Sequence, residues 1–223
     1  MIWKTKELQD TVLAKYGNKQ GMSLTQCLIA IEKRQRFARY HFSEFKRLLE
    51  DNINDLILGN DDNDPHAEAH IFALMQCMHG IHDTLAHAIY YALVMDIDSE
   101  MQFTDKRNIN ITNVKGKLLL NNKYKDLVRL ITKLVCNDNY KFLNAYVNHS
   151  KHRSLINMVR LIDGKKKENM CQLVFSKFNH NHDSFDEKPI TEYIELEYHR
   201  QAKLVVDIGI EINKVVQQKG YEI

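Results

Sequence analysis

The chain has 223 residues, which is long enough for one sizeable hydrophobic core or two small ones. Hydrophobic residues make up 44% and charged residues 27%, a composition that argues against global disorder. The net charge of +2, counted with neutral histidines, argues against bulk electrostatic binding of nucleic acid but is compatible with a local basic patch.

The scarcity of chain breakers favours helices. With 8 Gly and 2 Pro, long helices are expected rather than a β-sandwich with many turns. No segment reaches the roughly 18 consecutive apolar residues of a membrane span, and the N-terminus lacks an apolar stretch of signal-peptide type. The four cysteines lack the spacing of a zinc knuckle or a thioredoxin-like motif. We therefore expect a cytoplasmic protein that does not associate with membranes.

The N-terminal part of the chain, residues 1–60, predicts helices. A short helix is expected over residues 3–15, ending near Gly17. Apolar residues then recur at helical spacing from Leu24 to Leu49, so a second helix is expected there, with a break near Asp51.

Residues 65–152 predict the central helices. Pro65 suits the first position of a helix, where its missing N–H costs nothing. This helix is expected to reach about Met95 and, because it is apolar over most of its circumference, to lie at the centre of a bundle. The segments that follow are a long polar connection at 97–123 with a short helix near 111–120, and helices at 124–136 and 140–149.

After Arg153 the hydrophobic period changes from helical to alternating. The segments 155–162 and 171–178 flank a polar loop that contains Gly164, so residues 153–180 predict an antiparallel β-hairpin. The remaining segments are interpreted as a loop at 179–188 and a closing helix at 190–218. The expected fold is mainly α: a single domain over 1–223, a helical bundle with a small antiparallel β-hairpin inserted before the C-terminal helix.

The densest group of basic residues is Asn148-His149-Ser150-Lys151-His152-Arg153, where four of six side chains can carry positive charge. In a nearly neutral chain this density suggests an anionic partner: a phosphate, a carboxylate ligand or an acidic patch of the same fold. A histidine beside Lys and Arg suits acid–base chemistry on a phosphodiester, because the cations stabilise developing negative charge. The alternative is a helix C-terminus whose basic residues complement the helix dipole.

A second group, His79, His82 and Asp83, lies on the expected central helix. Offsets of three and four residues place these side chains near one another. This group has three possible interpretations. It could hold a metal ion, it could provide an acidic partner for Lys151 or Arg153, or it could be a buried polar network that fixes helix packing. Because the His-Glu-x-x-His pattern is missing, we expect no metal and no cofactor.

Asp83 is the only carboxylate of this helix between Glu68 and Asp96. A partly desolvated cation needs a counter-charge or hydrogen bonds, so the basic turn is expected to converge with His82 or Asp83. The other histidine pairs, His66 with His70 and His180 with His182, are interpreted as solvated.

The stretch Tyr146 to Arg153, together with a His–Asp pair on an earlier helix, resembles bacterial helical proteins of the broad HEPN-like class. The resemblance covers about residues 65–215. It implies a helical bundle that is often dimeric; many such domains are metal-independent ribonucleases of toxin or phage-defence systems, and others are non-catalytic. The catalytic motif of that class is an Arg followed, after four to six residues, by a His on a late helix. No Arg stands at that distance before His149 or His152, and Arg36 and His41 satisfy the spacing on an earlier helix.

Two functions are therefore expected as alternatives. In the first, the chain acts on or binds RNA or nucleotide phosphates as a homo-oligomer. His152 is then the acid–base group, Lys151 and Arg153 contact phosphate, and Asn148 orients the site. The remaining candidate binding residues are His79, His82, Asp83 and His149. In the second, the chain is a non-catalytic interaction or ligand-binding protein whose polar cluster is structural.

Overall fold

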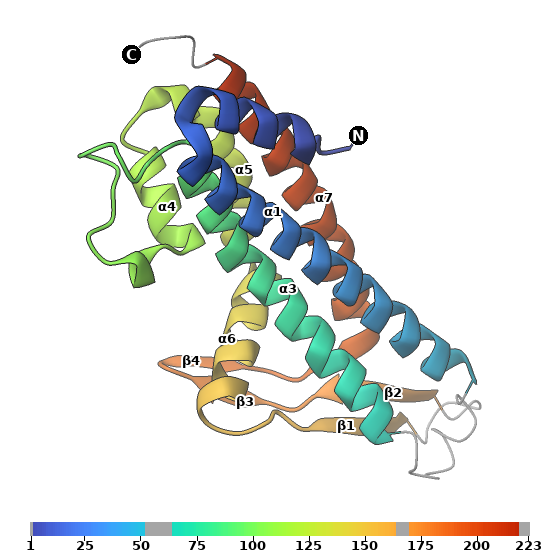
Figure 1. Cartoon of the computed structure of the whole chain (residues 1–223). Coiled ribbons are helices and arrows are strands. Elements are labelled where there is room, and N and C mark those ends of the chain that lie inside the picture. Colours follow the sequence, from blue (N-terminus) through green and yellow to red (C-terminus); the bar gives the residue numbers. More distant parts are fainter. Residues whose placement is uncertain (1, 52–63, 164–169, 219–223) are drawn as a thin grey trace. The chain divides into compact units, whose positions relative to one another are not determined.

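The computed structural model describes residues 2–51, 64–163 and 170–218 and confirms the mainly α fold with antiparallel β-structure before the last helix (Figure 1). The helices are α1 (Thr5–Asp51), α3 (Asp64–Ala92), α4 (Ile111–Leu118), α5 (Lys125–Val135), α6 (Asp138–His152) and α7 (Ile190–Gln218), with short 3₁₀ turns η2 (Lys106–Asn108) and η3 (Asn122–Tyr124). The strands are β1 (Met158–Asp163), β2 (Met170–Phe175), β3 (Phe178–His180), β4 (Asp183–Phe185) and β5 (Lys188–Pro189).

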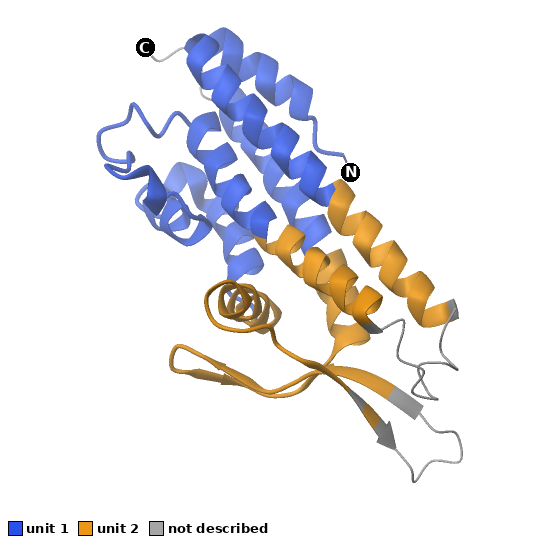
Figure 2. Ribbon diagram, turned by 60° about the horizontal axis from the view of Figure 1, so that its bottom comes forward, with its two compact units in different colours: residues 1–35, 80–137, 200–223 blue, residues 36–79, 138–199 orange. Residues whose placement is uncertain are grey.

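The chain divides into two compact units (Figure 2). Unit 1 comprises residues 1–35, 80–137 and 200–223, and unit 2 comprises residues 36–79 and 138–199. The three long helices α1, α3 and α7 each contribute residues to both units. All of the β-strands belong to unit 2 among the described residues.

Helix α1 corrects the expected gap between residues 15 and 24. The helical path is interrupted at Gly17, whose φ of 81° lies in the region that favours glycine, and it resumes directly afterwards. Tertiary contacts within unit 1 support the resumed helix: Gln20 is buried and its amide donates to the Asp96 carboxylate. Local sequence alone favoured a loop here.

Helix α3 has the buried apolar face that the sequence predicts. Met75 and Met78 are buried in unit 2, and Leu85 and Ile89 are buried in unit 1. The helix ends at Ala92, shortly before the expected end, and the chain then turns through Val94 with a positive φ of 57°.

The β-structure confirms one expectation and corrects another. Strands β1 and β2 pair antiparallel from Met158↔Phe175 to Asp163↔Met170, as the alternating pattern predicts; the expected turn at 164–169 lies outside the described residues. The loop expected at 179–188 is wrong. Strands β3 and β4 form a second antiparallel hairpin, and β5 pairs with β2. Asn181, with φ 54°, makes the tight turn possible because asparagine tolerates the left-handed region.

The core of unit 2 is rich in aromatic rings. Phe142 of α6 lies at its centre, 4.9 Å from the Tyr193 ring and 5.4 Å from the Phe175 ring, measured between centroids. Phe178 and Phe185 stack at 4.9 Å and so attach the β3–β4 hairpin to this core. The position of the hairpin therefore depends on side-chain packing more than on its few backbone hydrogen bonds.

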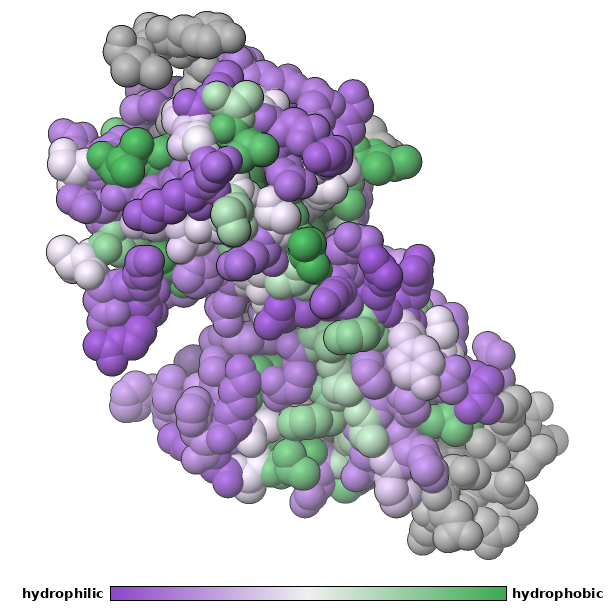
Figure 3. Space-filling model, viewed as in Figure 1, coloured by the Kyte–Doolittle hydropathy of each residue, from purple (hydrophilic) through white to green (hydrophobic). Residues whose placement is uncertain are grey.

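The surface in Figure 3 is largely hydrophilic, with hydrophobic residues interspersed. Among the described residues, no helix combines the length and the apolar character that crossing a membrane requires.

Candidate functional site: a cationic cluster in unit 2

The basic turn forms the C-terminal end of α6. Buried residues earlier in the helix, such as Phe142 and Tyr146, fix its orientation. Lys151, His152 and Arg153 are exposed, and the Arg153 N–H donates to the His149 carbonyl at 2.9 Å. Positive side chains are favoured at this end of a helix because its carbonyl groups carry partial negative charge.

Asn148 belongs to a hydrogen-bonded chain inside unit 2. Its Nδ2 donates to Asn144 Oδ1 at 3.1 Å, and the same oxygen lies 3.0 Å from His79 Nε2. Since an amide oxygen only accepts, His79 Nε2 carries the hydrogen. The structure thus joins two of the predicted site residues, His79 and Asn148. It does so through Asn144, whose position one helical turn before Asn148 was the only sequence signal for its role.

His149 connects the end of α6 to β3 through both ring nitrogens. Nδ1 lies 3.1 Å from the Asn179 carbonyl oxygen, so this nitrogen must donate. Nε2 lies 3.3 Å from Ser154 Oγ. The ring also meets the Phe178 ring edge-on at a centroid distance of 5.5 Å. His149 is therefore a positioning residue, and the motif divides into an inner part, Asn148 and His149, and an exposed part, Lys151 to Arg153.

His180 is a member of the site that the sequence interpretation missed. The register of the β3–β4 hairpin pairs it with Asp183, and its ring centroid lies 6.3 Å from that of His149. Its Nδ1 is buried and, among the described residues, has no hydrogen-bond partner. The available signal was the alternation of Phe178, His180, Asp183 and Phe185 about a two-residue turn, but three-residue strands are too short for a periodic pattern.

Several basic groups at the end of α6 act on the pKa of His180. Burial lowers the pKa of His180 from its ordinary value of 6.5, and the positive charge of Arg153 lowers it further. His149 and His152 act in the same direction, whereas Asp183 opposes them. We call His149, Lys151, His152, Arg153 and His180 the cationic cluster.

This electrostatic link gives a direct expectation. Replacing Arg153 by alanine should raise the pKa of His180 towards 6.5, because a nearby positive charge no longer disfavours the imidazolium. The measurement is a histidine-edited NMR titration, with Lys177→Ala as the charge-matched control, since Lys177 is exposed and pairs with Asp186 at 3.5 Å. An unchanged pKa in Arg153→Ala would show that the two groups are not neighbours.

Because folding lowers the pKa of His180, this residue contributes to the stability of the fold at neutral pH. The contribution is lost as the pH falls from 6.5 through the pKa of the folded state.

The other two predicted site residues belong to unit 1. His82 is buried, with 1% of its surface exposed. Asp83 is exposed rather than enclosed, and its carboxylate acts on His87, where it partly offsets the lowering of the pKa by burial. Convergence of His82 or Asp83 with the basic turn of unit 2 stays a prediction.

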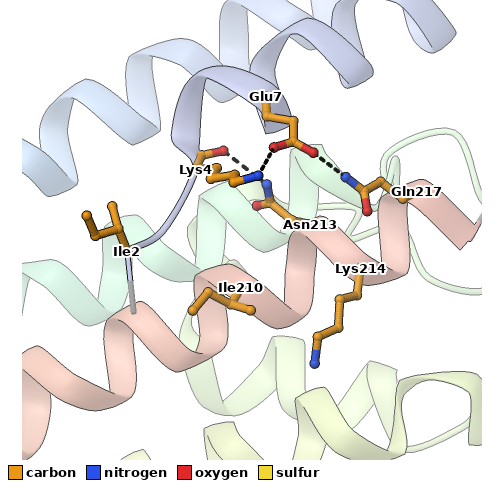
Figure 4. A pocket seen from close by; sticks show the side chains of 7 residues that line it. All are labelled: Ile2, Lys4, Glu7, Ile210, Asn213, Lys214 and Gln217. Carbon is orange, nitrogen blue, oxygen red and sulfur yellow. Dashed lines mark hydrogen bonds and ion pairs between the residues drawn. The ribbon is translucent and has the colours of Figure 1, made fainter.

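No group of three or more His, Cys, Asp or Glu side chains suited to a metal ion occurs among the described residues. A pocket of about 270 Å³ lies in unit 1, where Glu7 pairs with Lys4 at 3.2 Å and accepts from Gln217 at 2.5 Å (Figure 4). Asn213 completes this pocket by donating to the Lys4 carbonyl at 3.0 Å. Since these polar groups satisfy one another, the pocket is better explained as an attachment of the N-terminal segment to α7 than as a ligand site.

Comparison of the chain with models of protein families, with curated proteins and with solved structures found no significant match in any of the three. The assignment of a function therefore depends on the cluster itself.

Proposed function

We propose that this chain is a HEPN-like protein that binds RNA through the cationic cluster. The observation that supports this proposal is the exposure of Lys151, His152 and Arg153 at the end of α6, where β3 places the imidazole of His180 beside that of His149. The positive charge of this site comes from the end of α6, since the lowered pKa of His180 favours its neutral form, and it is concentrated there although the net charge of the chain is only +2. Such local concentration of positive charge favours a polyanion over a neutral ligand.

The inner and outer residues have different roles in this proposal. Asn148 and His149 are held by hydrogen bonds to Asn144, Asn179 and Ser154, so they fix the end of α6. The exposed Lys151 and Arg153 contact phosphate oxygens, for which Arg offers two parallel donors and Lys a point charge.

His152 is the acid–base candidate because it is exposed between these two cations. In RNA cleavage a base takes the proton of the 2′-hydroxyl, whose oxygen then forms a bond to phosphorus, while an acid protonates the departing 5′-oxygen. An imidazole can perform either transfer, because it can both accept and donate a proton. This chemistry needs no metal ion, in keeping with the ribonucleases of the class that the motif resembles.

The second candidate function is a non-catalytic interaction protein whose polar residues are structural. The observation that favours it is the series of hydrogen bonds that joins His79, Asn144 and Asn148, all within unit 2. The two functions differ in what the exposed residues do: a structural network does not require Lys151 and Arg153.

The test is fluorescence anisotropy with a labelled single-stranded RNA at several salt concentrations. The double variant Lys151→Ala/Arg153→Ala is expected to bind at least tenfold more weakly. Its slope of log K against log salt should be shallower by about 1.4, because each phosphate contact to a single strand contributes roughly 0.7. The control variant Lys125→Ala/Arg129→Ala removes the same charge from exposed positions of α5 and should behave like the wild type.

Equal weakening in both double variants would indicate a non-specific charge effect and would remove the proposal. If the RNA binds as proposed, incubation with EDTA separates enzyme from binding protein. Cleavage that persists in EDTA and disappears in His152→Ala supports the catalytic role, whereas intact RNA assigns the chain to the binding class. Light scattering of the same samples tests the expected homo-oligomer.

A further inference from the structure

Two histidines outside the cationic cluster face each other in unit 2. His41 of α1 and His70 of α3 approach until their Nδ1 atoms are 3.0 Å apart. The ring of Tyr40 lies edge-on to both, with centroid distances of 5.2 Å to His41 and 5.9 Å to His70. Both histidines are partly exposed, so the pair lies near the surface of unit 2.

The distance between the two Nδ1 atoms is close to that of two histidine ligands on one metal ion. Tetrahedral zinc holds imidazole nitrogens at about 2.0–2.1 Å, which places two such nitrogens about 3.3 Å apart. The observed 3.0 Å requires the rings to separate by only a few tenths of an ångström. Without a metal, one Nδ1 donates its hydrogen to the other. Binding a metal replaces this hydrogen and requires both rings to turn slightly, so that their Nδ1 lone pairs point to an ion beside the line between the nitrogens.

We propose that His41 and His70 bind a divalent transition-metal ion, zinc in the first instance, which links α1 to α3 within unit 2. Imidazole nitrogen suits zinc, copper and nickel, whereas magnesium and calcium prefer oxygen ligands. Because no three metal-ligating side chains converge among the described residues, that part of the chain supplies two ligands, and water or an external ligand completes the coordination in this proposal.

The proposal is independent of RNA binding, since neither histidine belongs to the cationic cluster. Isothermal titration of the purified full chain with zinc chloride, after treatment with a chelator, should show one dominant site. His41→Ala and His70→Ala are each expected to weaken zinc binding at this site at least tenfold. His66→Ala is the matched control: it removes an exposed histidine one turn from His70 on the same helix and should leave zinc binding unchanged.

Titration with cobalt(II) provides a second measurement, because nitrogen ligation produces visible absorption bands. These bands should be present in the wild type and in His66→Ala and absent in both pair variants. Circular dichroism checks that the variants are folded. Zinc binding that is equally strong in the wild type and in His41→Ala and His70→Ala would place the metal elsewhere, and no detectable binding in the folded wild type would refute the site. Lys151→Ala/Arg153→Ala should keep zinc binding, so failure of the RNA proposal and failure of this one are distinguishable.

Discussion

Replacing Gly209 by alanine is expected to lower the free energy of unfolding by about 3 kcal/mol, near the upper end of the usual range for overpacking. Gly209 is buried in α7, and a methyl group there would overlap the indole ring of Trp3. The ring is buried and its Nε1–H donates to Asn213 Oδ1 at 3.0 Å, so it cannot easily move aside. At a helical position with free space, a change from glycine to alanine raises the free energy of unfolding by about 0.5–1 kcal/mol. A decrease for Gly209→Ala therefore measures the steric overlap with Trp3.

Urea denaturation followed by circular dichroism measures this effect, with Gly116→Ala as the control. Gly116 lies in α4 and has no neighbour within 4 Å of an added methyl group, so that variant should be as stable as the wild type or more stable. The double variant Trp3→Ala/Gly209→Ala should lose less unfolding free energy than the two single variants added together, because alanine at position 3 removes the steric overlap. Equal stability of Gly209→Ala and Gly116→Ala would contradict the packing of Trp3 on α7.

Replacing Phe142 by alanine is expected to cost about 3–5 kcal/mol, the range for removing a buried aromatic ring. Phe142 is 2% exposed, and its ring meets those of Phe175, Phe178 and Tyr193 at 5.4, 5.5 and 4.9 Å. The cavity left by the ring would open between α6 and both β-hairpins. Thermal and urea unfolding of the purified variant give the magnitude.

The control for this variant is Phe37→Ala, also in unit 2, where the ring is 55% exposed and the expected cost is below about 0.5 kcal/mol. If the proposed function is correct, Phe142→Ala should also weaken RNA binding, because Phe178 and Phe185 hold the β3–β4 hairpin and thereby His180 against the core. If Phe142→Ala lowers the free energy of unfolding no more than Phe37→Ala does, this aromatic core does not determine stability.

The long elements could be predicted because their information is local. The apolar stripe of α3 repeats over many turns, and Met75, Met78 and Leu85 are buried as the pattern requires. The β1–β2 hairpin was recognisable from the change of period after Arg153, and the paired register from Met158 to Asp163 confirms it. Both signals accumulate over several residues, so a single atypical residue does not change the prediction.

The composition of the site could be predicted in part. The basic turn at the end of α6 is visible as a sequence motif, and His79 and Asn148 are joined in unit 2. Asn144, the residue that joins them, carries no signal apart from its spacing. Asp83 appeared to be an internal counter-charge because it stands alone in an apolar helix, yet its side chain is exposed. The sequence pattern gives the spacing of residues along a helix, but it does not show which other element packs against each face of that helix.

By itself, the sequence determined the helices, the first hairpin, the buried face of α3 and the basic turn that ends α6, because periodicity and chain breakers act over short distances. The tertiary structure alone decided that α1 resumes directly after Gly17, that the β3–β4 hairpin forms and that His180 packs beside His149. It also decided the approach of His41 to His70. Each of these features depends on contacts between residues far apart in the chain, and such contacts are made only when the apolar faces pack together.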